Sequence, residues 1–255
     1  MSSSATVVFV HGNPETADIW SPLIVELRQR GVDNVIALSP PGFGAPTPDS
    51  WNATVIEYRD WLIAQLESIG GSIHLVGHDW GAGHVFSALA ARPDLVTSWA
   101  ADCAGLLHPD YVWHDAAQGW QTADIGEAMV QGMVEMADDV FVETFSALGM
   151  SPVVASQVKK GINAEMARCI LALYRDARQP TMSRLGERLF LAQPRNGLVI
   201  MAENDHFAGS IASMEEVAGI LNADTAFISG VGHWWMCEKP SVAANVLIDH
   251  WDSVK

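Results

Sequence analysis

The residues best placed to do chemistry lie in the segment Gly77-His78-Asp79-Trp80-Gly81. The apolar run Ile73–Val76 precedes this segment and a helix-like stretch, Gly81–Ala91, follows it. Small residues on both sides of one polar residue are what a nucleophile elbow requires, because this strand-to-helix turn is sharp, strained and crowded. The elbow usually presents a serine, whereas this sequence predicts that it presents the carboxylate of Asp79.

A carboxylate at the elbow favours a particular reaction. With an ordinary pKa of about 3.9 it is ionised at neutral pH without help from a base. It is a poor nucleophile toward amides and ordinary esters, but it suits attack on a saturated carbon that bears a leaving group, which gives an ester intermediate. Water must then hydrolyse that ester, and this second step needs a histidine base.

Three other loops supply the remaining groups. The stretch His11-Gly12-Asn13-Pro14 follows the first apolar run, and its position predicts that the backbone amides of Asn13 and Trp80 form an oxyanion hole for the inactive carboxylate oxygen. His233 lies in Gly230-Val-Gly232-His233-Trp234-Trp235, after the last apolar run, and is the predicted base.

The acid that orients this base is expected on another loop that follows a strand. Asp205 in Met201-Ala-Glu203-Asn204-Asp205-His206 gives the chain order nucleophile, acid, base. Asp102, after the strand that follows the elbow helix, is the rival, and Glu203 is a weaker third choice. The other eight histidines are interpreted as structural by default.

The elements that must position these loops alternate along the chain. Six short and almost continuously apolar runs are typical of strands buried on both faces: Thr6–Val10, Val35–Leu38, Ile73–Val76, Ser98–Ala101, Leu198–Ala202 and Thr225–Ile228. Helix-like segments lie between and after them: Glu15–Arg30, Asn52–Ile69, Gly81–Ala91 and Ser241–Ser253. This alternation predicts an α/β fold with a mostly parallel sheet flanked by helices.

The alternation stops between about Leu106 and Gln193, where the pattern is helical throughout. The predicted helices are Ile125–Met136, Asp139–Leu148, Pro152–Lys160 and Asn163–Ala177, with Ser151 as an N-cap before Pro152. We therefore expect a core domain made of residues 1–105 and 194–255, and an inserted helical cap over residues 106–193.

Composition limits the partners. The chain has 255 residues and a formal net charge of −16, so its surface should repel nucleic acid and anionic membranes. The N-terminal stretch does not resemble a signal peptide, and three widely spaced cysteines, Cys103, Cys169 and Cys237, favour neither a disulfide framework nor a zinc site. We expect a cytoplasmic protein, with a homodimer left open. No cofactor is expected, because Pro41-Gly42-Phe43-Gly44 lacks the rest of a dinucleotide fingerprint.

Taken together, these motifs resemble the α/β-hydrolase superfamily, and specifically its aspartate-nucleophile branch of epoxide hydrolases and haloalkane dehalogenases. The resemblance rests on His-Gly-Asn-Pro, Gly-His-Asp-Trp-Gly, the helical insertion, Asp205 and Gly-His233-Trp, and it spans nearly the whole chain. It implies an Asp79 ester intermediate that is hydrolysed by water activated at His233. Trp80 stands where fluoroacetate-type enzymes carry an arginine, which argues against a carboxylate substrate.

Within the branch, the leaving group decides the substrate. An epoxide opens to a strongly basic alkoxide that needs a proton donor, and Cys169-Ile-Leu-Ala-Leu-Tyr174-Arg175 resembles the cap segment that supplies a tyrosine to epoxide hydrolases. Tyr111 and His114 are candidates for a second donor. A halide needs only N–H donors, and Asn13 with Trp80 resembles the dehalogenase clamp.

The preferred interpretation is an epoxide hydrolase that converts a small apolar epoxide to a vicinal diol. The alternatives are a haloalkane dehalogenase and a non-catalytic, ligand-binding homologue. The residues expected to line the substrate pocket are Tyr111, Trp113, His114, Trp120 and Trp234.

Overall fold

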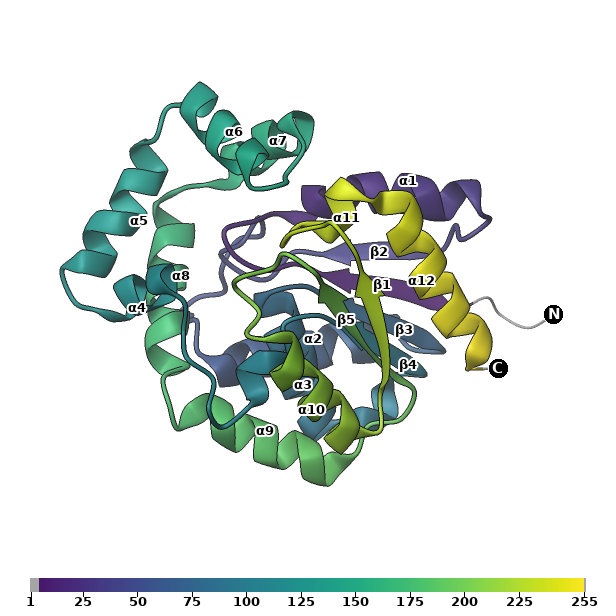
Figure 1. The fold of residues 1–255 in the computed structure, drawn as a ribbon. Helices are drawn as coiled ribbons and strands as arrows, with labels where there is room; N and C mark the ends of the chain where they lie inside the picture. The colour runs from purple at the N-terminus through teal and green to yellow at the C-terminus, as the bar shows by residue number, and fades with distance from the viewer. Residues whose placement is uncertain (1–4, 255) are drawn as a thin grey trace.

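The computed structural model describes residues 5–254 and contains one parallel sheet; residues 1–4, part of the N-terminal stretch considered above, and Lys255 lie outside the described residues. The strands run in the order β2-β1-β3-β4-β5-β6, and every described pair is parallel (Figure 1). Their bounds are β1 Thr6–Val10, β2 Val35–Leu38, β3 Ile73–Gly77, β4 Ser98–Ala101, β5 Gly197–Ala202 and β6 Asp224–Ile228. The predicted fold class is confirmed, and each strand agrees with its apolar run to within one residue.

The register of the central strands brings the functional loops together. Val10 at the end of β1 pairs with Gly77 at the end of β3, and Gly77 pairs in turn with Ala101 at the end of β4. The loops after these strands therefore leave the same edge of the sheet side by side. The central strands are apolar on both faces because helices cover both, whereas most residues of the edge strand β6 are exposed.

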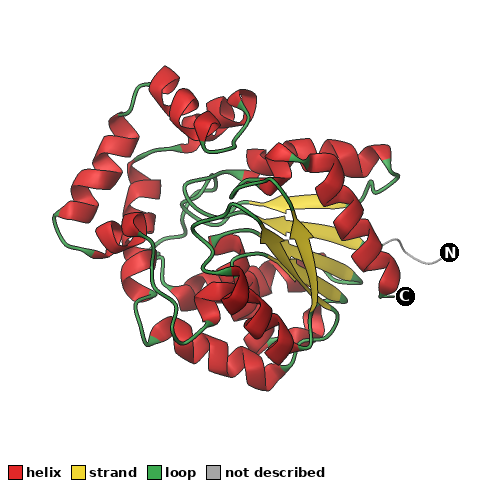
Figure 2. Ribbon diagram, in the orientation of Figure 1, coloured by secondary structure: helices red, strands yellow, loops and turns green. Residues whose placement is uncertain are grey.

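Two helical layers sandwich the sheet (Figure 2). On one face α1 packs against α11 and α12, and on the other α3 lies between α2 and α9, with α10 beside α9. The bounds in these layers are η1 Ala17–Trp20, α1 Ser21–Gln29, α2 Val55–Ile69, α3 Trp80–Ala91, η2 Pro93–Leu95, α10 Ile211–Leu221, α11 Trp235–Glu238 and α12 Pro240–Ser253. The core between sheet and layers includes the fully buried Phe9, Trp20, Tyr58, Trp99 and Trp235.

Two helices begin later than their patterns suggest, and local chemistry explains both. The predicted helix Glu15–Arg30 is a 3₁₀ turn followed by α1, because Pro22 lacks the N–H that would continue the preceding turn and instead occupies the first turn of α1. The helix predicted to start at Asn52 starts at Val55, where Thr54 and Glu57 form a capping box. Glu15 is consequently free of any helix and is fully buried in a loop.

A helical insertion separates β4 from β5. Its elements are η3 Ala104–Leu107, α4 Asp115–Gln121, α5 Ile125–Glu135, α6 Asp138–Ala147, α7 Pro152–Gly161, α8 Ala164–Asp176 and α9 Thr181–Ala192. Ser151 accepts a hydrogen bond from the Val154 amide and caps α7. Helices α4 to α8 stand beyond the carboxyl ends of the strands, whereas α9 packs along α3 (Figure 1). By packing, α9 therefore belongs with the core although it lies inside the range 106–193.

None of the helices between residues 5 and 254 combines the length and the apolar character that crossing a membrane would take.

Candidate active site

The turn between β3 and α3 forces the Asp79 backbone into a strained conformation. Its φ of 52° and ψ of −122° lie where a side chain is costly, as expected for an elbow. The turn also packs so closely on β1 that a Cβ atom at Gly81 would lie 2.0 Å from the carbonyl oxygen of Val10. Glycine is required at that position, and the result is a carboxylate that faces the cap from the end of the sheet.

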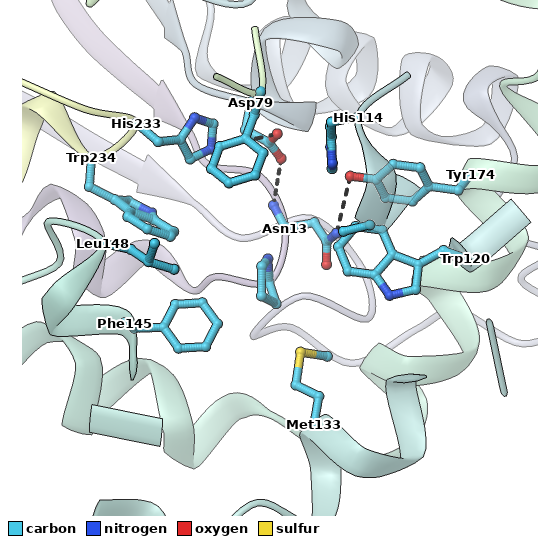
Figure 3. A pocket seen from close by; sticks show the side chains of 13 residues that line it. Asn13, Asp79, His114, Trp120, Met133, Phe145, Leu148, Tyr174, His233 and Trp234 are labelled. Atoms are coloured by element: carbon cyan, nitrogen blue, oxygen red, sulfur yellow. Dashed lines mark hydrogen bonds and ion pairs between the residues drawn. The ribbon is translucent and has the colours of Figure 1, made fainter. Parts of the chain in front are cut away.

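Backbone amides hold one oxygen of this carboxylate. The Asn13 N–H donates to Oδ1 of Asp79 over 2.8 Å (Figure 3), and the backbone N–H of Trp80 also bonds the carboxylate. Gly12 permits this approach, because a Cβ atom there would lie 2.2 Å from the same Oδ1. The second oxygen, Oδ2, is left facing His233, whose Nε2 is 3.8 Å away. The structure thus separates a held oxygen from one that can react.

Asp205 orients the ring of His233. Its Oδ2 lies 2.9 Å from Nδ1 of His233, and its Oδ1 accepts the Phe207 N–H. The rival acids point elsewhere: Asp102 bonds His78 and Trp235, and the exposed Glu203 accepts the Gly230 N–H. Of the three predicted acids, Asp205 is the one placed behind the ring.

Burial and neighbouring charges act against each other on these groups. Burial raises the pKa of Asp79 to about 6, although the nearby His233 lowers it. Burial would also raise the pKa of Asp205, but the charge and hydrogen bond of His233 outweigh it and lower that pKa to about 2. Burial disfavours the charged form of His233, yet Asp205 raises its pKa overall. The ring therefore gains proton affinity from the acid behind it.

Tyr174 brings a hydroxyl from the cap to the group of polar side chains around Asp79. It sits near the end of α8, and its oxygen accepts a hydrogen bond from Nδ2 of Asn13 over 3.4 Å (Figure 3). The indole of Trp80 lies edge-on to its ring and also bonds the phenol side chain. Burial and the charge of Asp79 raise the pKa of Tyr174 well above its usual value, so the phenol stays protonated at neutral pH.

A cavity of about 180 Å³ lies between the elbow and the cap, and residues of both line it. Its polar groups, contributed by Asn13, Asp79, His114, Tyr174 and His233, gather at one end (Figure 3). The remaining wall is apolar and is formed by Pro14, Ala116, Trp120, Met133, Phe145, Leu148, Phe207 and Trp234. The cavity therefore suits a compact apolar molecule whose reactive end meets Asp79.

Tyr111 and Trp113 are not among the residues that line this cavity within 5–254. They line an adjoining space of about 20 Å³ that Asp79, His114 and Tyr174 also line. The Tyr111 hydroxyl donates its hydrogen to the Phe207 carbonyl over 3.0 Å, so it has no hydrogen left for a substrate. Trp113 stacks on Trp80 with ring centroids 6.0 Å apart. Their predicted place in the substrate pocket stays a prediction.

His114, in contrast, presents a defined donor. Its Nδ1 accepts the Ala117 N–H at the start of α4 over 3.3 Å, and burial together with His233 lowers its pKa to about 4. A neutral ring whose Nδ1 accepts must carry its hydrogen on Nε2. His114 therefore lines the cavity as a neutral N–H donor.

Several lining residues escaped the sequence argument. Met133, Phe145 and Leu148 lie on or beside cap helices and Phe207 follows Asp205, and nothing in their types separates them from core residues. Glu15 was also missed, although an acid directly after His-Gly-Asn-Pro is a signal that could have been used. His11, His74, His78, His84, His108, His206 and His250 are not among the residues that line the cavity within 5–254.

Two clusters of potential metal ligands adjoin the site: Glu15, His78 and His233, and Cys103, Asp205 and His233. Both nitrogens of His78 and Nδ1 of His233 already face carboxylate oxygens. The expectation that the protein needs no cofactor stays a prediction.

Comparison with known proteins places this arrangement in a family. A model described as an alpha/beta hydrolase family matches residues 7–245. A haloalkane dehalogenase of Mesorhizobium japonicum is 29% identical over 147 residues, covering 56% of this chain and 46% of that protein. An epoxide hydrolase of Caballeronia sordidicola is 36% identical over 92 residues, covering 34% of this chain and 27% of that protein. The aligned parts span less than half of these relatives.

The similarity to solved structures extends over the whole fold. A variant of the haloalkane dehalogenase DatA from Agrobacterium tumefaciens superposes with a TM-score of 0.76 at 20% identity, covering 99% of this chain and 91% of that one. An E-2-(acetamidomethylene)succinate hydrolase superposes with a TM-score of 0.71 at 17% identity, covering 98% and 92%. The parallel sheet, the elbow and the family match together establish that the chain belongs to the α/β-hydrolase family.

Proposed function

We propose that the protein is an epoxide hydrolase that opens a compact apolar epoxide to a vicinal diol. The observation that carries the proposal is the Tyr174 hydroxyl, which lines the same end of the cavity as Asp79. Because this oxygen accepts the Asn13 amide, its own hydrogen is free to point at a substrate. The Nε2 hydrogen of His114 is a second donor at the same end. An alkoxide that forms there meets donors at once.

The proposed reaction uses these groups in turn. Oδ2 of Asp79 attacks a ring carbon, the carbon–oxygen bond breaks, and the oxygen takes up the proton of Tyr174. Water next attacks the Asp79 ester carbonyl while Nε2 of His233 removes its proton. The backbone amides of Asn13 and Trp80 stabilise the negative oxygen of that intermediate. The diol leaves, and the proton on His233 returns to the phenol by way of solvent.

A second candidate, haloalkane dehalogenation, is favoured by a separate observation. Nδ2 of Asn13 donates to the Tyr174 hydroxyl, and the indole of Trp80 lies edge-on to the Tyr174 ring, so N–H donors gather at the end of the site that holds Asp79. A halide is a weak base that needs such donors but no proton. The similarity to a haloalkane dehalogenase reported above supports this second candidate function.

Paired tyrosine variants separate the two candidates. In Tyr174→Phe we expect diol formation from racemic styrene oxide to fall by about 10²-fold, because the donor to the alkoxide is lost. Tyr111→Phe is the matched control and should retain activity, since its hydroxyl bonds a carbonyl. Full diol formation by Tyr174→Phe would refute the epoxide argument. Halide release from a short bromoalkane, with no diol from any epoxide, would favour the alternative.

Trapping the intermediate tests the nucleophile itself. In His233→Gln the ester should form but persist, because its base is missing. Mass spectrometry of peptides after exposure to styrene oxide or a bromoalkane should find the adduct on Asp79, and Asp79→Asn should carry none. Binding of these compounds with neither adduct nor turnover would point to a non-catalytic homologue.

A further inference from the structure

Three buried ionisable side chains have no part in the chemistry above. Glu15, His78 and Asp102 are at most 2% exposed and are absent from the residues that line either cavity within 5–254. Buried charged groups are costly unless they are paired. Their presence directly behind the nucleophile therefore calls for an explanation.

Both nitrogens of the His78 ring face carboxylate oxygens. Nδ1 lies 2.5 Å from Oδ2 of Asp102, and Nε2 lies 3.1 Å from Oε1 of Glu15. A carboxylate only accepts hydrogen bonds, so each nitrogen must donate and the ring carries a positive charge. The pKa values agree: burial opposes the charged forms, but the partners raise the pKa of His78 well above its usual value and lower that of Glu15 to about 2.

The other carboxylate oxygens bind the backbone of the catalytic loops. Oδ1 of Asp102 accepts the Asp79 N–H at the strained elbow, and Oε2 of Glu15 accepts the Gly12 N–H, both over 2.9 Å. Gly12 precedes Asn13, whose amide holds the nucleophile. One end of the trio therefore holds the elbow, the other holds the loop after β1, and His78 is the link between them.

The same trio reaches the loop that carries the base. The indole of Trp234 donates to Oε1 of Glu15 over 2.5 Å, and that of Trp235 donates to Oδ2 of Asp102 over 2.7 Å. The rings of His78 and His233 lie 4.4 Å apart between centroids. Three loops that are distant in sequence thus converge on one buried group of charges.

We propose that His78 is a positioning residue: a buried cation between Glu15 and Asp102 that holds the elbow, the loop after β1 and the base loop in the arrangement that ester formation and hydrolysis require. The inference rests on the proposed function only for its kinetic readout. Loss of the cation frees the two carboxylates to repel each other, so the loops separate. A misplacement of about 1 Å can cost about 10²-fold in rate.

The first measurement does not depend on turnover. ¹⁵N NMR of the histidine side chains should show His78 protonated on both nitrogens at pH 8, and one unprotonated nitrogen would overturn the inference. The amide signals of Gly12, Asn13 and Asp79 report the loop positions directly. They should shift in His78→Gln and stay in place in His250→Gln, whose side chain is also buried but lies on α12.

The second measurement is the rate of ester formation per active site, so that protein that has not folded does not affect the result. Glu15→Gln/His78→Gln removes one carboxylate and one cation together, so the charge of the trio is unchanged even if His78→Gln alone fails to fold. The amplitude of the single-turnover reaction gives the active fraction, and its rate constant refers to those active sites alone. We expect ester formation per active site to fall about 10²-fold in the double variant, with KM little changed. A wild-type rate per site, or equal losses in His250→Gln, would overturn the positioning role.

The pH dependence supplies a third readout that a purely structural role would not change. Charged or titratable groups face His233 from every loop around it: Asp205 after β5, Asp79 and His78 at the elbow, Glu15 after β1, His114 in the cap and Cys103 after β4. Removing the cation in His78→Gln should raise the proton affinity of His233. The acid limb of ester hydrolysis should then move up by about one pH unit. An unmoved limb would contradict the inference.

If the wild-type protein forms no ester with either an epoxide or a bromoalkane, the proposed function fails. The inference about His78 is then decided by the NMR signals alone, because they require no substrate. Unchanged amide positions in His78→Gln would refute it independently of any activity.

Discussion

The pH dependence of ester formation tests the environment of Asp79 directly. Only the ionised carboxylate attacks, and burial raises its pKa to about 6. About nine in ten of the side chains are then ionised at pH 7 and about one in eleven at pH 5. The single-turnover rate of ester formation should accordingly fall about tenfold between these values. An exposed aspartate, with a pKa of about 3.9, would give almost no change over that range.

The contact between His233 and Asp79 also predicts the direction in which the pH midpoint of ester formation moves when His233 is replaced. His233 lies 3.8 Å from Oδ2 of Asp79 and lowers its pKa. In His233→Gln that influence is lost, so the midpoint of ester formation should move to higher pH. Rapid-quench mass spectrometry of the adduct between pH 4 and 8 measures both limbs, with Tyr111→Phe as the control. A midpoint near pH 4 in the wild-type protein, or a shift to lower pH in His233→Gln, would refute the reasoning.

Three other changes have outcomes that the contacts define. Gly12→Ala places a Cβ atom 2.2 Å from Oδ1 of Asp79, so turnover should fall by about 10²-fold or more in a protein whose circular dichroism is otherwise preserved. Asp205→Asn leaves the His233 ring without its acid, so the Asp79 ester should accumulate in mass spectra and steady-state turnover should drop by about 10³-fold or more. Acid should destabilise the fold, because the lowered pKa values of Glu15 and Asp205 stabilise the folded state above about pH 4. This contribution, on the order of a few kcal/mol, is lost as the pH falls toward 2. Protonation of Asp79 between pH 6 and pH 4 acts in the opposite direction, because its pKa is raised in the folded state. Urea titrations from pH 6 to pH 2 measure the net effect, and a flat unfolding free energy across that range would contradict it.

The sequence alone predicted those parts of the fold and site for which a local pattern of residues is compatible with only one structure. Apolar runs such as Ile73–Val76 predicted the strands, and the glycines around Asp79 predicted the elbow, because few other turns need small residues on both sides. Chain order placed Asp205 and His233 on loops at the carboxyl edge, where the parallel register brings them together. These predictions needed no knowledge of how distant side chains pack.

The sequence could not decide roles that depend on packing across the chain. Tyr111 and His114 are three residues apart in the cap and could not be separated by type. In the structure, the Tyr111 hydroxyl donates to the Phe207 carbonyl, while the Ala117 amide binds Nδ1 of His114 and leaves the hydrogen of that ring on Nε2. Chain order favoured Asp205 over its rival Asp102, and the structure shows why they differ: Asp205 binds His233, whereas Asp102 binds His78. Hydrogen-bond partners decide these roles, and they come from segments that the local pattern does not contain.

The charges of the site also suggest how one histidine serves a two-step reaction. In the resting protein Asp205 and Asp79 both raise the pKa of His233. Under the proposed mechanism, attack converts Asp79 to a neutral ester, so one of these two influences disappears. The cation on His78, 4.4 Å away between ring centroids, continues to oppose a charge on His233. The proton affinity of the ring therefore falls once the ester exists, and His233 becomes a base at the step that requires one.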